Sequence, residues 1–376
     1  MRPHFTFLFL ALAACSPLWP LPALAQARTA PPQTAGFQRL SRAAERARQA
    51  NRDDEAIRLY QRALEMQPDW DEGLWNLSSL LYEKEKYSEA RDRLRSFVAD
   101  QPKAGMGWAL LGLSEFQTRE YARALDHFRQ AMTLGMGGSR GMARSVFYYA
   151  AALLTRFEMY DQSQSLLFDM ARAGQAESFL VQALGLAVLR MPLLPQEVPP
   201  DRREMVRLAG EGALALNDQH QDEAKKLFRQ MTTTYPNEPG VHFLFGAFLM
   251  NVRPEEGIRE MQRELEISPF HLPARVRLAD EYVREGKLDL GLSLAEEAVK
   301  LDPNDASTHM SYGGALIAKG DSSGGIRELE MARDQAPETV RIRWALFRAY
   351  SAAGRSEDAN REKAAVEKLS QPSGQP

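Results

Sequence analysis

The stretch that decides the fold reads GWALLG at residues 107–112 and is followed by Ala124, Phe128 and Ala131. Spacings of three and four residues place side chains on one face of a helix, so the pattern predicts two helices joined by a short turn. Gly112 has no side chain and lets the second helix approach closely, while Phe128 fills the space one turn beyond Ala124. Such a pair cannot cover its own apolar face, which predicts neighbouring copies.

Copies of this pattern recur along the chain. Ala56, Ala90 and Ala124 are 34 residues apart. In the second half, prolines 236, 269, 303 and 337 recur 33, 34 and 34 residues apart, and each is expected to end a helix because it has no amide hydrogen to donate. The W-x2-L-G and A-x3-F-x2-A spacings resemble the tetratricopeptide repeat (TPR) family, whose unit is a helix-turn-helix of about 34 residues. The resemblance implies an all-α fold, a right-handed superhelical solenoid of about nine repeats in two arrays.

The sequence divides into six segments. We predict a signal peptide at residues 1–25, a linker at 26–36 and an N-terminal array at 37–190, the last part of which is degenerate. A Pro-rich break at 191–203 follows, because prolines exclude a regular helix there. Residues 204–369 form a C-terminal array with a capping helix, and 370–376 are a disordered tail.

The first 25 residues have the layout of a secretory signal peptide. Arg2 precedes an uncharged, mostly apolar run, and Ala23 to Ala25 form a small-x-small cleavage site. Residues 12–15 read LAAC, which resembles the lipobox of bacterial lipoproteins, where Cys15 would be acylated. Cleavage after Ala25 and lipidation at Cys15 are both open. Both predict an exported protein, periplasmic or secreted, which contacts the membrane only if it is lipidated.

Composition and motifs favour binding over catalysis. Net charge is −3, without the basic footprint of a nucleic-acid binder. Cys15 is the single cysteine, which excludes a disulfide framework or a cysteine zinc site in the rest of the chain. A formal G-x-S-x-G match at 137–141 falls in a turn between repeats, with no strand before it. We therefore expect no catalytic residue, metal, cofactor or small-molecule substrate. An enzyme site near the Pro-rich break is a remote alternative.

The TPR resemblance implies that the first helix of each pair lines a concave groove. Eight aromatic or apolar residues lie beside the packing positions of these helices and are predicted to bind a partner: Trp75, Tyr82, Phe116, Tyr148, Phe243, Met250, Met310 and Trp344. Exposed apolar surface with Trp and Tyr is typical of protein-binding sites. The expected ligand is an extended or helical segment of another protein.

The resulting function hypothesis is an exported protein–protein interaction scaffold or adaptor. A more specific alternative is an envelope lipoprotein assembly factor, similar to the TPR lipoproteins that help to insert outer-membrane barrels or secretin rings. Its support is the sequence at residues 12–15 alone.

Overall fold

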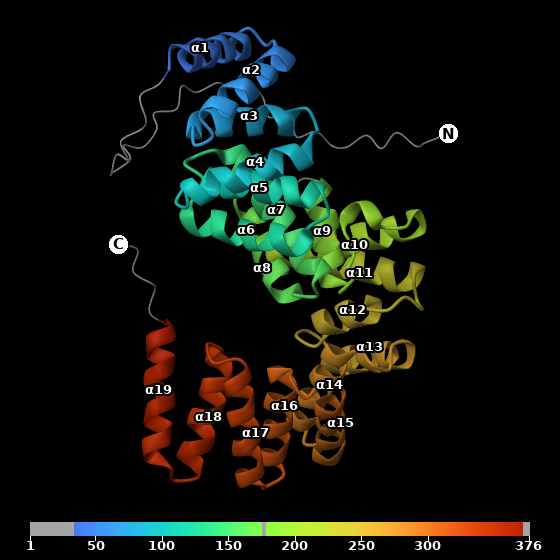
Figure 1. Cartoon of the computed structure of the whole chain (residues 1–376). Helices are drawn as coiled ribbons and strands as arrows, with labels where there is room; N and C mark the ends of the chain where they lie inside the picture. The colour runs from blue at the N-terminus through green and yellow to red at the C-terminus, as the bar shows by residue number, and fades with distance from the viewer. Residues whose placement is uncertain (1–33, 175–177, 371–376) are drawn as a thin grey trace. The chain divides into compact units, whose positions relative to one another are not determined.

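The computed structural model describes residues 34–174 and 178–370 (Figure 1). This part of the chain folds into nineteen α-helices and two short 3-10 helices, which confirms the all-α prediction. The predicted signal peptide, Cys15 and the tail from 371 onward lie outside the described residues. Contacts between Cα atoms divide the chain into two units. Unit 1 runs through Ala183 and includes Pro192–Gln196, and unit 2 comprises Leu184–Met191 and the residues from Glu197 onward.

Unit 1 is a row of four helix pairs. Its helices are α1 (Ala35–Gln49), α2 (Asp53–Met66), α3 (Asp71–Glu83), α4 (Tyr87–Asp100), α5 (Gly105–Gln117), α6 (Tyr121–Leu134), α7 (Arg140–Arg156) and α8 (Tyr160–Arg172). Each odd-numbered helix packs against the helix that follows it, and consecutive pairs stack. Helix α9 (Ser178–Val188) follows the four pairs, and the boundary between the two units falls within it.

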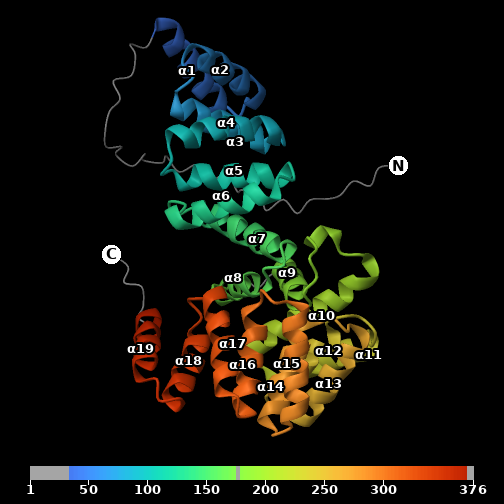
Figure 2. The same ribbon diagram turned by 60° about the horizontal axis from the view of Figure 1, so that its bottom comes forward.

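Unit 2 is a row of five helix pairs. Figure 2 shows the pairs α14–α15 and α16–α17 side by side. Its helices are α10 (Arg203–Asn217), α11 (Gln221–Thr234), α12 (Val241–Leu249), α13 (Pro254–Ile267), α14 (Leu272–Arg284), α15 (Leu288–Leu301), α16 (Ala306–Ala318), α17 (Ser322–Gln335), α18 (Val340–Ala352) and α19 (Ser356–Ser370). The nine pairs agree with the predicted number of repeats.

The glycine, alanine and phenylalanine of the pattern pack as the sequence predicts. A Cβ atom on Gly112 would lie 2.7 Å from the Phe128 ring and 3.2 Å from the Ala124 carbonyl oxygen. Ala124 and Phe128 are fully buried. In unit 2, a Cβ atom on Gly212 would lie 2.5 Å from the Phe228 ring. The aromatic ring therefore occupies the volume that a larger residue on the first helix would need.

Successive pairs are joined by a recurring hydrogen bond. The residue six positions after the proline that closes one pair donates a side-chain N–H to the carbonyl oxygen of that proline. The bond is 2.9 Å from Trp108 to Pro102, 3.0 Å from His242 to Pro236 and 2.9 Å from His309 to Pro303. Arginine makes the same bond at Arg275 to Pro269 and at Arg343 to Pro337. At these five junctions the side chain therefore donates an N–H as well as packing, whereas Leu74, six residues after Pro68, only packs.

The Pro-rich segment is an ordered connection. It contains the 3-10 helices η1 (Pro195–Glu197) and η2 (Pro200–Arg202), and Leu194 and Val198 are buried. Within unit 1, Arg156 donates to the Pro192 carbonyl at 3.0 Å. Apolar burial and satisfied carbonyl groups thus replace the regular helix that the prolines exclude.

Candidate protein-interaction surface

Three of the predicted binding residues lie half-buried on the first helices of unit 1. The Trp75 ring on α3 lies 5.8 Å from Phe97, and the Tyr82 ring lies 5.2 Å from Tyr87. Tyr148 on α7 meets Phe179 edge-on at 4.9 Å. Burial raises the pKa of the Tyr148 hydroxyl, so this phenol stays neutral at physiological pH. Each ring is held by packing on one side and keeps an accessible part.

Two of the predicted residues are buried instead. Phe116 is 7% exposed, because Tyr149 from the next pair covers its ring at 4.4 Å. Met250 is 8% exposed and packs in an apolar cluster with Met261 and Leu278. This burial is at odds with the expectation that both face an open groove. Helix rotation inferred from sequence carries an error of about one residue, and a packing position lies next to each groove position.

The other three residues lie on three of the first helices of unit 2. Phe243 on α12 is half-buried and its ring lies 4.7 Å from the His271 ring. Met310 on α16 is half-buried against the apolar cluster that contains Leu346. Trp344 on α18 is 42% exposed, with Phe347 edge-on at 5.2 Å. Trp344 is therefore the most accessible of the eight predicted residues.

A buried polar cluster that the sequence analysis missed fixes the start of α12. Glu264 on α13 is buried, and its carboxylate accepts from the Gly240 N–H at 2.7 Å and the Phe243 N–H at 3.1 Å. It therefore supplies the acceptor that the first turn of α12 lacks. Other copies carry an apolar residue here, either small, such as Ala131, or large, such as Met231, so a glutamate at this place in the repeat was the available signal.

His271 lies beside this carboxylate and begins the next first helix. Its Nδ1 accepts from the Ala274 N–H at 3.2 Å, which requires an unprotonated Nδ1, and its Nε2 lies 3.9 Å from Glu264. Burial, helped by the charge of Arg190, lowers the pKa of His271 to about 4. Burial also raises the pKa of Glu264, against the lowering effect of its two backbone hydrogen bonds. The cluster therefore favours neutral His271 and orients Phe243.

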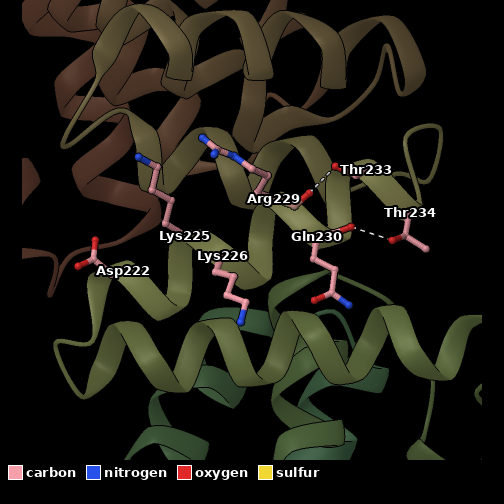
Figure 3. A pocket seen from close by; sticks show the side chains of 7 residues that line it. All are labelled: Asp222, Lys225, Lys226, Arg229, Gln230, Thr233 and Thr234. Atoms are coloured by element: carbon pink, nitrogen blue, oxygen red, sulfur yellow. Dashed lines mark hydrogen bonds between the residues drawn. The ribbon is translucent and has the colours of Figure 1, made fainter.

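Two surface hollows lie away from the predicted binding residues. One, of about 530 Å³, runs along α11 and is lined by Lys225, Lys226, Arg229 and their neighbours (Figure 3). Lys225 and Arg229 point to one side of the helix and Lys226 to the other. All the described residues that line it come from this one helix, whereas ligand sites are built from convergent groups of several elements.

The second hollow, of about 380 Å³, lies in unit 1 between α4, α5 and α6. Its floor is the buried carboxylate of Glu115, which meets His127 at 2.6 Å and Arg95 at 3.1 Å. The Trp108 ring lies 5.0 Å from the His127 ring in a tilted arrangement. The Glu115 carboxylate is therefore already paired within the chain, as in a structural polar network. Within residues 34–174 and 178–370, no group of three or more His, Cys, Asp or Glu is placed to hold a metal ion.

The fold and this surface define a helix-pair repeat scaffold, and comparison of the sequence identifies the repeat. A model of the tetratricopeptide repeat family matches residues 41–91, 76–139 and 276–339. The chain thus contains tetratricopeptide repeats in both units. A comparison with curated proteins finds no match. In the described part of the chain, no helix is both long and apolar enough to cross a membrane.

Several solved structures are similar over less than half of this chain. "MamA RS-1 ArsTM double mutant" is 19% identical, with a TM-score of 0.39 over 44% of this chain and 94% of its own. "MamA 41-end from Desulfovibrio magneticus RS-1" is 19% identical, with a TM-score of 0.37 over 44% of this chain and 93% of its own. "Crystal structure of MamA protein" is 14% identical, with a TM-score of 0.38 over 46% and 98%. No functional inference rests on similarity at this level.

Proposed function

We propose that this protein is an exported, non-catalytic scaffold that binds a segment of another protein along the first helices of its repeats. The observation that carries the proposal is the row of partly exposed aromatic and apolar side chains at equivalent positions of these helices. Trp75 and Tyr148 represent the row in unit 1, and Met310 and Trp344 represent it in unit 2. Rigid aromatic side chains of this kind contribute much of the affinity at protein interfaces.

Selection of random peptides on the purified protein tests this proposal. Peptides displayed on phage and enriched by the wild-type protein are titrated against a variant with Trp75, Tyr148 and Trp344 all changed to alanine. Because interface hot spots contribute about 2 kcal/mol or more each, we expect affinity to fall at least tenfold for peptides that reach one of these residues.

The matched control changes exposed apolar residues on second helices, Leu290, Leu301 and Met331, to alanine. Circular dichroism first establishes that both variants keep the helix content of the wild type. The control is expected to keep wild-type affinity. Equal losses in the two variants, or no loss in either, would contradict binding through the first helices.

Export is the second part of the proposal, and it rests on residues 1–25. Fusion of residues 1–33 to alkaline phosphatase, which is active only outside the cytoplasm, should give an active enzyme. The alternative, an envelope lipoprotein assembly factor, requires acylation at Cys15. It predicts that labelled palmitate is incorporated into the wild type and not into Cys15→Ser. An inactive fusion would contradict export, and an unlabelled wild type would eliminate the lipoprotein.

A further inference from the structure

Charge is segregated between the first and second helices of the last three pairs. The first helices α14, α16 and α18 together carry six arginines and two carboxylates, a formal charge of +4. The second helices α15, α17 and α19 together carry ten carboxylates and six Lys or Arg, a formal charge of −4. The whole chain has a net charge of only −3. One side of these pairs is therefore basic although the protein is slightly acidic.

Half of the six arginines are held by carboxylates in close ion pairs. Arg275 pairs with Glu297, Arg343 with Glu362 and Arg284 with Glu281. The other three are Arg277, Arg341 and Arg348, which are exposed.

Of these three, Arg341 forms an ion pair, and its partner is Asp280. Arg341 reaches it at 3.8 Å, a long ion pair between α18 and α14, while the Ser311 hydroxyl of α16 donates to Asp280 at 2.6 Å. Within the described residues, Arg277 and Arg348 form no ion pair. The first-helix face therefore keeps positive charge that the fold does not neutralise.

Two of these arginines flank the exposed tryptophan. Arg341, Trp344 and Arg348 are spaced three and four residues apart on α18, which places them on one face of the helix. Arg341 is 72% exposed and Trp344 is 42% exposed, whereas Ile342 and Leu346 point into the core. Guanidinium groups recognise carboxylates through paired hydrogen bonds, and an indole ring offers an apolar platform between them.

The neighbouring helix α16 leaves room beside this face. It carries no Asp, Glu, Lys or Arg, and its Gly314 is exposed. A Cβ atom on Gly314 would meet nothing within 4 Å, whereas one on the adjacent Gly313 would lie 2.8 Å from the Gly325 carbonyl oxygen. Packing therefore requires Gly313 and not Gly314. A glycine in a helix interior lowers stability relative to alanine, and no packing contact requires a glycine at position 314.

We propose that the face made by Arg341, Trp344 and Arg348 on α18, together with Gly314 on α16, binds an acidic segment of another protein that also carries an aromatic or apolar side chain. Figure 1 shows these helices in orange to red. Carboxylates of the segment pair with the two arginines, its apolar side chain lies on Trp344, and its backbone passes over Gly314. Residues 1–33 and 371–376 contain no Asp or Glu, so these residues do not supply the acidic segment.

This inference rests on the proposed function and specifies the chemistry of one ligand. Its test is fluorescence anisotropy of a short labelled peptide of alternating Asp and Phe, compared with the same peptide carrying Asn in place of Asp. The Asp peptide should bind more tightly, and added salt should weaken it because the pairing charges are exposed. Arg341→Ala with Arg348→Ala should reduce affinity at least tenfold.

Two further variants separate binding from folding. Lys363→Ala with Lys368→Ala removes the same charge from the second helix α19 and should leave affinity unchanged. Gly314→Leu should weaken binding without lowering the urea midpoint, because its side chain enters open space.

Three results would overturn the proposal: equal binding of the Asp and Asn peptides, equal losses in the two charge variants, or arginine-dependent binding to phosphatidylglycerol vesicles but not to the peptide. If any of these results is found while the binding of phage-selected peptides still requires Trp75 and Tyr148, the proposed function stands and this inference alone fails. Sedimentation of the protein over a concentration range tests a second copy as the occupant. The proposal is also overturned if the protein self-associates, if the Arg341→Ala and Arg348→Ala variant does not, and if the Asp peptide fails to compete with the self-association.

Discussion

Two adjacent glycines on α16 should respond to alanine with opposite signs. Gly314→Ala places its methyl group in open space, so only the helix preference changes, and it should stabilise unit 2 by about 1 kcal/mol. Gly313→Ala gains the same helix preference, but its Cβ atom would lie 2.8 Å from the Gly325 carbonyl oxygen and 3.0 Å from Leu329 Cγ.

The magnitude of the second change follows from what must move. The Gly325 oxygen belongs to the backbone of α17, so relief of the overlap requires α16 and α17 to separate. Overpacking of this kind costs about 1–3 kcal/mol. The gain of about 1 kcal/mol in helix preference is common to both variants, so Gly313→Ala should be less stable than Gly314→Ala by roughly 1–3 kcal/mol and less stable than the wild type by up to about 2 kcal/mol.

Urea unfolding followed by circular dichroism measures the difference. Repeat proteins can unfold in parts, so the two variants are compared by the midpoint of the same transition, with equal slopes as the condition for comparison. The midpoint should rise for Gly314→Ala and fall for Gly313→Ala. Equal stabilisation of both variants would refute the packing argument for the glycine of the repeat pattern.

Substitutions at three further residues test the polar contacts. His271 has a pKa of about 4 in the fold, below its unfolded value of about 6.5, so its contribution to stability is present above pH 6.5 and is lost as pH falls towards 4. His271→Asn keeps an acceptor for the Ala274 N–H. Urea titrations at neutral and acid pH should show that acid lowers the free energy of unfolding of this variant by up to roughly 3 kcal/mol less than that of the wild type. If acid destabilises both proteins equally, another group causes the effect. Glu264→Ala leaves the Gly240 and Phe243 N–H groups without their acceptor and should cost about 1–3 kcal/mol for each. Glu264→Gln keeps one acceptor oxygen and should retain part of that stability in the same urea assay. Equal urea midpoints for the two variants would contradict the capping role. Trp108→Phe removes the hydrogen bond to Pro102 and should cost about 1 kcal/mol by urea midpoint, while no loss would show that the bond adds nothing to ring packing.

The repeat fold was predictable because its determinants are local. Gly112, Ala124 and Phe128 each meet partners within the same 34-residue copy, so their spacing in the sequence is also their spacing in the packed pair. The prolines end second helices for a reason that no distant contact can alter. The glycine-rich stretch near residue 137 is a turn between α6 and α7, as its place between two copies of the pattern predicts.

The binding surface was less predictable because burial depends on neighbouring copies. Phe116 has the pattern of a groove residue, but Tyr149 of the next pair covers it. Glu264 and His271 form one cluster only after two repeats stack, and no single copy contains both. The donor role of His242 and His309 was within reach, because each follows a helix-closing proline by six residues, as Trp108 does.

Site-specific photo-crosslinking tests the central claim most directly. A benzoylphenylalanine placed at Tyr148 or Trp344 samples the first helices, and one at Leu290 samples a second helix with a similarly accessible side chain. In the presence of a phage-selected peptide, we expect crosslinks from at least one of the first two sites and none above background from Leu290. Crosslinks from Leu290 alone would place the peptide on the second helices and contradict binding through the first.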